Sequence, residues 1–524
     1  MTLTPGVARA LVVAAAIAAV PAAALVPQGS GAGRVEVGYV FSTDATTLLA
    51  PLIDRFNKEQ HAVHITSVPL ASGQAEAALA ARSEQPVLWT PASALWGGLL
   101  NHDVAATWVR GDYPSLVASP QVIAMWENLA HALGRGERKV GWQDLLELAT
   151  SGHGWAAYGH PELGAFKLGH TNPDISTSGL LAVASEYYAV THKQRGLSLA
   201  DIHRPKVRAA VRAIERSIVH YGETAAYLTD QMDLYGQEYA HAVYIQETTL
   251  RTFNKKRKQA TRLVEILPAE GTFVADYPLM LLDAPWVSEK TRAAAERFRA
   301  WLVSKITPTL ARANGFRPRR PAGIRLLELP DPEILAAIRT GWHADRKPAN
   351  IVLVVDTSAS MGGAGRLDAA KRGLRSFVRN LSSEDRVSLV TSGSTVSTSV
   401  DLGRSRAAVA RAVRGLFPNG ELPVYGAISR ALDAVRALHD QSRINAVVVL
   451  SDGAGTKSGL DHLLAQIRSE PVTEGTSVRI FAVAYGANAD TRELKKIAIA
   501  SRGAFFAGGP SDIQNVYRSI SSYF

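Results

Sequence analysis

The sequence contains no cysteine and only 5 methionines in 524 residues. The absence of cysteine excludes disulfide bonds, zinc–thiolate sites, thiol nucleophiles and a lipid-modified cysteine after a signal sequence. Aromatic residues make up 7% of the chain and charged residues 20%, while 47% of the residues are hydrophobic. This composition is ordinary for globular protein, and the length predicts two to four domains.

Signatures of common enzymes are also missing. No His-Glu-x-x-His and no Gly-x-Ser-x-Gly sequence occurs, so zinc proteases and α/β-hydrolases lack their markers. The glycines at 363 and 365 suggest a dinucleotide loop, but Asp368 stands where the third glycine belongs, and its charge would repel a pyrophosphate. We therefore predict no catalytic residues and no enzymatic activity; a hydrolase remains a minor alternative.

Only one long apolar run is present. It extends from Ala10 to Val26, follows Arg9, and is about as short as a membrane-spanning helix can be. Residues 1–33, with a glycine-rich linker at their end, are therefore predicted to be a secretory signal peptide or an N-terminal membrane anchor. Both alternatives place the protein outside the cytoplasm, either secreted or at the cell surface.

The charge balance is moderately basic. Lysine and arginine number 57 against 47 aspartates and glutamates, a formal charge of +10 that favours acidic partners or anionic surfaces. The basic run from Lys255 to Lys258 suggests contact with nucleic acid, but export argues against this. We predict a solvated helix end there and no nucleic-acid partner.

The last third of the chain, residues 349–524, alternates between apolar runs and segments with helical spacing. Short apolar runs that end in turn residues are typical of buried strands in a parallel sheet. They are Ile351–Val355, Val387–Val390, Ala446–Leu450 and Val478–Ala484. The alternation predicts a doubly wound α/β domain.

Two of these runs end in acidic and hydroxyl residues. The first is followed by Asp356, Ser358 and Ser360, and the third by Ser451 and Asp452. Because the carboxyl ends of parallel strands meet at one sheet edge, these side chains are expected to face one point. Oxygen ligands of this kind are those that Mg²⁺ prefers.

Residues 349–524 resemble a von Willebrand factor type A domain. Asp-x-Ser-x-Ser from Asp356 to Ser360 is similar to the first sequence of that family's metal-ion-dependent adhesion site, and Asp452 to its later aspartate. The resemblance implies a magnesium site with Asp356, Ser358, Ser360 and Asp452 as ligands. It also implies a protein partner that contributes a carboxylate to the cation.

The chain departs from the family pattern at one ligand. Leu422 stands where a threonine is usual, and leucine cannot bind a metal, although the neighbouring Glu421 offers an alternative oxygen. A second interpretation remains open, in which the serine hydroxyls only cap the helix that follows.

Residues 34–320 also have an α/β pattern, with strands expected at Val35–Val40 and His64–Val68 and a helix from Leu48 to Glu59. Ser, Thr and Gly precede several expected helices, and helix N-termini bind anions and polar groups. The order of these features resembles the two-lobed extracellular solute-binding proteins of bacterial importers. The resemblance implies a small polar solute or an oxyanion bound by Ser42, Thr43, Ser72, Gly73, Thr90, Ser176, Thr177, Ser178 and Glu247.

Residues 321–348 are predicted to be a linker between the two modules, since they follow a basic, proline-rich stretch that is expected to be extended and exposed. Partial order is expected there, because the segment has enough apolar residues to pack on the protein. Two functions remain open. The first is an exported binding protein whose second module binds a protein partner through a divalent cation. The alternative is a solute receptor that delivers its ligand to an ABC-type importer.

Overall fold

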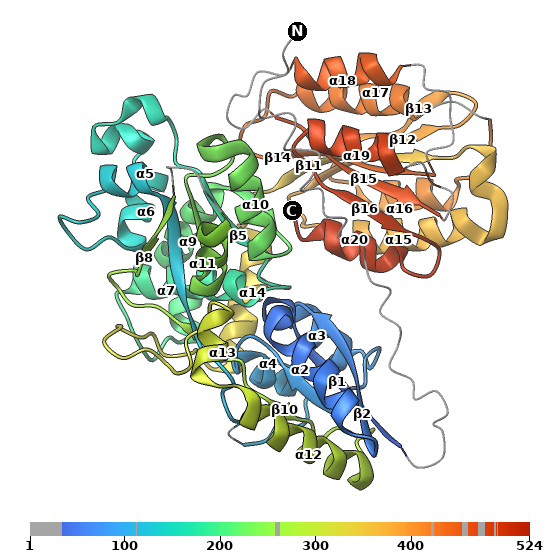
Figure 1. Ribbon diagram of the computed structural model, residues 1–524. Helices are drawn as coiled ribbons and strands as arrows, with labels where there is room; N and C mark the ends of the chain where they lie inside the picture. Colours follow the sequence, from blue (N-terminus) through green and yellow to red (C-terminus); the bar gives the residue numbers. More distant parts are fainter. Residues whose placement is uncertain are drawn as a thin grey trace. The chain divides into compact units, whose positions relative to one another are not determined.

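The fold is that of a computed structural model of the 524-residue chain (Figure 1). The structure describes residues 34–111, 113–256, 262–420, 424–452, 459–469, 477–486, 489 and 491–524. The described residues form two compact units, one ending at Arg346 and one beginning at Lys347. We call them the N-terminal unit (34–346) and the C-terminal unit (347–524).

The N-terminal unit contains two lobes, each built on its own sheet. Lobe 1 has a four-stranded sheet in the order β10-β3-β1-β2, in which β1 is parallel to β2 and β3. Its elements are β1 (Val35–Ser42), α2 (Thr46–Glu59), β2 (Val63–Leu70), α3 (Ser72–Ala80), β3 (Leu88–Thr90), α4 (Leu95–Asp103), β10 (Met280–Leu281), α12 (Glu289–Lys305) and α13 (Pro308–Ala313).

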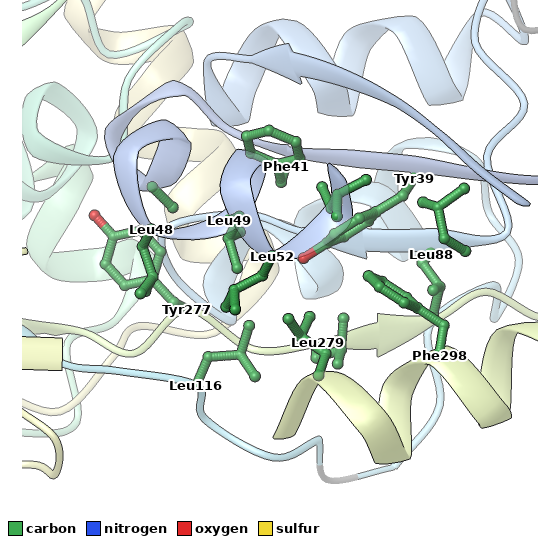
Figure 2. Packing of buried hydrophobic residues seen from close by; sticks show 14 of the residues in the cluster. Tyr39, Phe41, Leu48, Leu49, Leu52, Leu88, Leu116, Tyr277, Leu279 and Phe298 are labelled. Atoms are coloured by element: carbon green, nitrogen blue, oxygen red, sulfur yellow. The ribbon is translucent and has the colours of Figure 1, made fainter. Parts of the chain in front are cut away.

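Lobe 1 is closed by residues from both ends of the N-terminal unit. Figure 2 shows Tyr39 of β1 beside Phe298 of α12, and the same buried cluster includes Phe41 of β1 and Leu279, which is more than 200 positions away. The rings of Tyr39 and Phe298 make an edge contact with centroids 5.7 Å apart. Chain segments that leave lobe 1 and return to it are what make a two-lobed arrangement from one polypeptide.

Lobe 2 has a sheet in the order β6-β5-β7-β4-β8, with β9 also paired to β4. β5 is parallel to both of its neighbours, whereas β4 is antiparallel to β7 and β8. Its strands are β4 (Ser119–Trp126), β5 (Leu168–Thr171), β6 (Ile218–Gly222), β7 (Ala242–Gln246), β8 (Leu263–Ile266) and β9 (Val274–Ala275). Its helices are α5 (Glu127–Ala132), α6 (Trp142–Thr150), α7 (Thr177–Thr191), α8 (Leu199–His203), α9 (Pro205–Arg216), α10 (Ala225–Tyr235) and α11 (Glu247–Lys256).

The segment predicted to be a linker packs on the N-terminal unit. The N–H of Leu327 donates to Thr272 at 2.9 Å, and Trp342 is fully buried. The helix α14 (Pro332–Asp345), which contains Trp342, contacts α4 of lobe 1 and α7, α8 and α9 of lobe 2. The compact N-terminal unit therefore extends to the end of this helix.

The C-terminal unit has one sheet in the order β13-β12-β11-β14-β15-β16, which is parallel except for β13. Its strands are β11 (Ala349–Asp356), β12 (Arg386–Ser392), β13 (Val396–Gly403), β14 (Ile444–Ser451), β15 (Arg479–Tyr485) and β16 (Phe505–Gly508). The apolar runs identified in the sequence form β11, β12, β14 and β15. The predicted α/β class, with a doubly wound second module, is confirmed.

Helices cover both faces of this sheet (Figure 1). α17 (Tyr425–Arg436), α18 (Leu460–Arg468) and α19 (Thr491–Ala500) lie on one face, where they bury Val352 and Val354 of β11. α15 (Arg366–Asn380), α16 (Arg406–Arg414) and α20 (Ile513–Ser521) lie on the other. Burial on both faces explains why the central strands are apolar without interruption.

Candidate functional site

The pairing of β11 with β14 brings the two acidic sequences together. The strands are parallel and Val355 aligns with Leu450, so Asp356 and Ser451 follow at neighbouring positions of the same edge. The hydroxyl of Ser451 donates to Oδ2 of Asp356 at 2.6 Å. Asp452 is the next residue, close enough for its charge to act on Asp356. Both carboxylates thus lie at the carboxyl end of the sheet, where open α/β folds bind ligands.

The serines of the first sequence turn towards the same place. The backbone N–H of Ser358 donates to Oδ1 of Asp356 at 2.8 Å, and the hydroxyl oxygens of Ser358 and Ser360 lie 2.9 Å apart. Ser358 precedes a short 3₁₀ helix from Ala359 to Gly365, and within the described chain its side chain makes no capping hydrogen bond. The helix-cap interpretation therefore lacks the hydrogen bond it requires at Ser358.

Asp356 is shielded from solvent and lies near a second carboxylate, that of Asp452. Asp356 is 2% exposed and Asp452 is 4% exposed. Burial raises the pKa of Asp356; hydrogen bonds from Ser358 and Ser451 oppose this rise, and the charge of Asp452 adds to it. The guanidinium of Arg366 lies 3.6 Å from Asp452 and offsets part of the charge. An oxygen-only donor set that holds two buried carboxylates fits a hard divalent cation.

The loop that contains Asn419 and Gly420 lies against the segment that follows Asp356. The N–H of Asn419 donates to Thr357 at 2.6 Å, and the N–H of Ala359 donates to Gly420 at 2.9 Å. Gly420 has a positive φ, and a Cβ atom there would lie 2.2 Å from the backbone N of Ser394, so this position requires glycine. Glu421 and Leu422, which follow, lie outside the described residues.

One large apolar side chain stands out beside this loop. Phe417 is 65% exposed, and it immediately precedes Pro418. A Cβ atom on Gly362, in the 3₁₀ helix of the first sequence, would lie 3.2 Å from the ring of Pro418. Phe417 thus belongs to the loop that borders the Asp356 site.

The N-terminal unit has a pocket of about 270 Å³ between its lobes. Lobe 1 contributes Thr43, Asp44 and Thr47, and lobe 2 contributes residues of α10 and α11. The lobe 2 residues include Asp230, Asp233 and Lys256, together with the threonines Thr224, Thr229, Thr248, Thr249 and Thr252. Hydroxyls and three carboxylates face one lysine, which is an environment for a polar, positively charged solute.

Two carboxylates of this pocket, Asp44 and Asp230, are partly shielded from water. Burial raises the pKa of Asp44, against hydrogen bonds from Ser42 and Gln246. Burial also raises the pKa of Asp230, an effect that Lys256 opposes. Because burial disfavours the ionised form of these carboxylates, a cation beside them would stabilise it and an anion would disfavour it further.

The residues predicted to bind a solute mostly hydrogen-bond within the protein. Thr43 lines the pocket, and Ser42 donates to Asp44 at 3.3 Å. Ser72 accepts from the N–H of Ala92, and Thr90 accepts from Tyr39 at 2.8 Å. Ser176 precedes α7, and Ser178 in its first turn is buried.

Glu247 is neutralised by arginine. It forms ion pairs with Arg251 at 2.6 Å and with Arg317 at 2.7 Å, and its side chain is 1% exposed. Its carboxylate therefore connects α11 to the chain after lobe 1's last helix, rather than facing the pocket lining.

Gly73 and Thr177 join the lobes directly. The N–H of Gly73 donates to Ile175 at 2.8 Å, and the indole of Trp96 donates to Thr177 at 2.8 Å. A Cβ atom at Gly73 would lie 2.1 Å from the carbonyl oxygen of Asp174, so no larger residue fits. At these positions the lobes touch and leave no space for a solute.

A second set of contacts ties the lobes through α14. Arg339 pairs with Glu76 at 3.4 Å and with Asp103 at 2.6 Å, both in lobe 1. Six residues further along the helix, Asp345 accepts from Arg208 and Arg212 of α9 in lobe 2. One helix therefore holds ionic contacts with both lobes.

The acidic pocket residues were missed at the level of sequence. Asp230 and Asp233 are three residues apart in α10, and this spacing, which places both on one face of a helix, was a signal in the sequence. Asp44, the third carboxylate, follows β1. The signal could not be connected to Asp44 without knowing which helix faces β1.

No helix in the described part of the chain is long and apolar enough to cross a membrane. The predicted signal peptide or anchor, residues 1–33, lies outside the described residues.

Comparison with known proteins identifies both units. Residues 39–317, more than half of the chain, match the family described as bacterial extracellular solute-binding protein. Residues 351–454 match the von Willebrand factor type A domain. Both families consist typically of binding proteins.

Individual relatives are distant. An uncharacterized protein of Mycobacterium tuberculosis (strain ATCC 25618 / H37Rv) is 28% identical over 251 residues, which is 44% of this chain and 33% of that protein. This chain thus spans about a third of the length of the curated relatives it matches.

Among solved structures, a von Willebrand factor type A protein from Catenulispora acidiphila is 20% identical, with a TM-score of 0.30, covering 33% of this chain and 42% of that one. The periplasmic binding protein P5PA is 11% identical, with a TM-score of 0.44, covering 60% of this chain and 100% of that one. The chain belongs to the bacterial extracellular solute-binding protein family and carries a von Willebrand factor type A domain in its C-terminal unit.

Proposed function

We propose that the chain is an exported, non-enzymatic binding protein whose von Willebrand factor type A domain binds a protein partner through a divalent cation. The observation that carries this proposal is the convergence of Asp356, Ser451 and Asp452 at the carboxyl edge of the sheet. Two carboxylates buried this close together need a positive charge, and the guanidinium of Arg366 reaches only one of them in the contacts described.

The proposed ligands are Asp356, Ser358, Ser360 and Asp452. When bound, the cation would offer an open position to a carboxylate of the partner. The chain's own residues do the rest: the Ser358 amide and the Ser451 hydroxyl orient Asp356, and Phe417 supplies an apolar contact at the rim. An exposed aromatic side chain beside a charged centre is a common feature of protein interfaces.

Titration calorimetry of the purified full chain with Mg²⁺ tests the cation site. We expect binding in the parent chain and its loss in Asp356→Ala. The matched control is Asp368→Ala, since Asp368 lies in the first turn of α15 with a side chain that is 74% exposed. Equal binding by parent and Asp356→Ala, or no binding by the parent, would contradict the proposal.

A second candidate function is a solute receptor, favoured by the pocket between the lobes. Its carboxylates from Asp44, Asp230 and Asp233 favour a positively charged solute, such as an amine, over an oxyanion. A thermal-shift screen with putrescine, choline, lysine, sulfate and phosphate tests this. Each tenfold excess over Kd adds about 1.4 kcal/mol of stability, and hits confined to the anions would contradict it.

The lobe contacts favour the first function over the second. A receptor of an importer has to open and close its lobes around the solute, by a hinge motion. Here α14 forms ion pairs with both lobes through Arg339 and Asp345, and Trp96 joins them directly. These contacts hold the lobes closed, which suits a scaffold more than a shuttle.

Export is part of the proposal. The solute-binding family is extracellular, and the apolar run from Ala10 to Val26 fits either a cleaved signal or a retained anchor. Mass spectrometry of the mature protein distinguishes the two, since cleavage removes this run. An intact N-terminus in the cytoplasmic fraction would contradict export.

A further inference from the structure

Three ionisable side chains in the interior of lobe 2 have no role in the functions above. They are His170 on β5, Glu186 on α7 and Glu215 on α9, and each is 0% exposed. One ligand atom from each lies within 4.8 Å of the others. With both carboxylates ionised and the imidazole neutral, this cluster would carry net negative charge in a medium that disfavours it.

The hydrogen bond on one side of the His170 ring defines what its other nitrogen can do. Nδ1 lies 2.7 Å from the carbonyl oxygen of Thr171, and because a carbonyl only accepts, Nδ1 carries the hydrogen. Nε2 lies 3.0 Å from Oε1 of Glu215. In the neutral ring this nitrogen has a lone pair, so two acceptors face each other. A proton or a metal ion is therefore required between Nε2 and Oε1 of Glu215.

Glu215 is oriented by two donors on its other oxygen. The hydroxyl of Tyr221 donates to Oε2 at 2.7 Å, and the indole N–H of Trp342 donates to it at 2.9 Å. Both contacts leave Oε1 turned towards His170. Metal-binding carboxylates and histidines typically make such hydrogen bonds through the atom that does not face the metal, here Oε2 of Glu215 and Nδ1 of His170.

Glu186 supplies the observation that separates this cluster from a simple ion pair. Neither of its carboxylate oxygens accepts a hydrogen bond from an N–H or a hydroxyl group of the described residues, although the side chain is fully buried, and the polar group beside it is the carboxyl group of Glu215. Burial raises its pKa, and both the charge of Glu215 and a hydrogen bond with the Glu215 side chain add to this effect. Buried polar groups are almost always satisfied, so a carboxylate without a donor indicates a missing partner.

We propose that His170, Glu186 and Glu215 bind one divalent transition-metal ion of the Zn²⁺ type. One nitrogen and carboxylate oxygens suit such an ion. The separation of 3.0 Å between Nε2 and Oε1, which is also that of a hydrogen bond, is short enough for both atoms to reach one metal. The site is distinct from the Asp356 cation site: it lies in the other unit, includes nitrogen, and is enclosed.

The proposed metal also acts on α14. Trp342 belongs to this helix and donates to Glu215, so a metal that fixes Glu215 stabilises the position of the indole. Hydrogen exchange in α14 is expected to slow when the metal is bound. The metal would then strengthen the tie between the lobes at the segment that leads into the C-terminal unit.

Zinc binding by the full chain carrying Asp356→Ala tests this proposal separately from the proposed function, because that substitution removes the other cation site. After chelator treatment and dialysis, calorimetry with Zn²⁺ is expected to show one site per chain. Glu186→Gln keeps the shape of the side chain and is expected to weaken binding about tenfold or more. The matched control Glu162→Gln, an exposed position of the same lobe, is expected to leave it unchanged.

Cobalt substitution covers the case in which Glu186→Gln fails to fold. Co²⁺ added to the chelated Asp356→Ala chain is expected to give visible absorption of an enclosed, low-coordinate site, which Zn²⁺ then removes. Absence of zinc binding in the parent, or binding that survives Glu186→Gln, overturns the proposal. A Glu186→Gln chain that is as stable as its parent with no metal bound by either would assign the position between Nε2 and Oε1 to a shared proton.

Discussion

Ser451 donates its hydroxyl hydrogen to Asp356 at 2.6 Å, although the two residues are 95 positions apart in the chain. The contact exists because β11 and β14 are neighbours in the sheet and end at the same level. It stabilises the charge of a carboxylate that burial disfavours. In the chain without a cation, Ser451 and the amide of Ser358 therefore do part of what a metal ion would do.

The first prediction concerns pH and Asp356. A folded-state pKa above the usual value means that the stability contributed by this group is complete at low pH and is lost as pH rises through the raised pKa. Without Mg²⁺, Asp356→Asn is therefore expected to be at least as stable as the parent at neutral pH. Mg²⁺ at about 100 times Kd should stabilise only the parent, by about 2.7 kcal/mol.

Scanning calorimetry can assign this change to the right unit. All 9 tryptophans lie before residue 347, so the C-terminal unit unfolds without a tryptophan signal. The calorimetric transition that has no matching change in tryptophan fluorescence belongs to the C-terminal unit, and its midpoint should rise with Mg²⁺ in the parent only. A parent much more stable than Asp356→Asn at neutral pH without cation would show that the carboxylate is already compensated.

The second prediction concerns Phe417. Phe417 is exposed and belongs to the loop that contacts the Asp356 segment, so a partner that places a carboxylate on the cation is expected to contact it. Peptides selected on the Mg²⁺-loaded chain from a displayed library should carry Asp or Glu beside apolar residues. Phe417→Ser should weaken their binding by about 1 kcal/mol or more while Mg²⁺ affinity stays unchanged. Fluorescence polarisation measures the first quantity, and unchanged peptide affinity would place the partner elsewhere.

The third prediction concerns the ion pairs that Arg339 of α14 forms with Glu76 and Asp103 of lobe 1. Burial raises the pKa of Glu76 to about 7, and the charge of Arg339 opposes this rise. Because the folded pKa lies above the ordinary value, the stabilising contribution is complete below about pH 4.5 and is lost as pH rises through about 7. The N-terminal unit should become less stable between about pH 5 and pH 8, by up to about 3 kcal/mol.

Urea unfolding followed by tryptophan fluorescence measures this slope, because the signal comes from the N-terminal unit alone. Glu76→Gln should flatten it. Arg339→Met should destabilise the unit by about 1–3 kcal/mol at neutral pH, since it removes the arginine that pairs with Glu76 and Asp103. A slope that persists in Glu76→Gln would assign the pH dependence to another group.

The fourth prediction concerns the pocket between the lobes. If an amine binds there, Asp230→Asn should weaken it by about tenfold, or about 1.4 kcal/mol, because one carboxylate is lost from a partly desolvated site. Glu59→Gln is the control, since Glu59 is half-exposed at the end of α2 and does not line the pocket. Equal affinity in Asp230→Asn and the parent would exclude this pocket as the amine site.

Much of the C-terminal unit could be predicted because its central strands are buried on both faces. The apolar runs identified β11, β12, β14 and β15, and their order placed Asp356 and Asp452 at one edge. The edge strand β13 was missed, since Val396–Gly403 is rich in serine and threonine and half-exposed. The helix α16 was also missed: Ser405 caps its start, but the helix is short.

The N-terminal site could be predicted less well. Ser72, Thr90 and Thr177 have the residue types of a ligand loop, but their partners Ala92, Tyr39 and Trp96 come from distant segments. Glu186 carried a signal, because it interrupts a helix whose other residues from Thr177 to Ala189 are apolar or small and are buried. Its neighbours His170 and Glu215 have no fixed spacing from it, so only the fold brings them together.

The most direct test of the cation-dependent binding site is a crystal structure of the full chain grown with Mn²⁺, with diffraction measured at the manganese absorption edge. We expect an anomalous peak beside Asp356, with Ser358, Ser360 and Asp452 around it. No peak there, with the guanidinium of Arg366 or the side chain of Leu422 in its place, would contradict it.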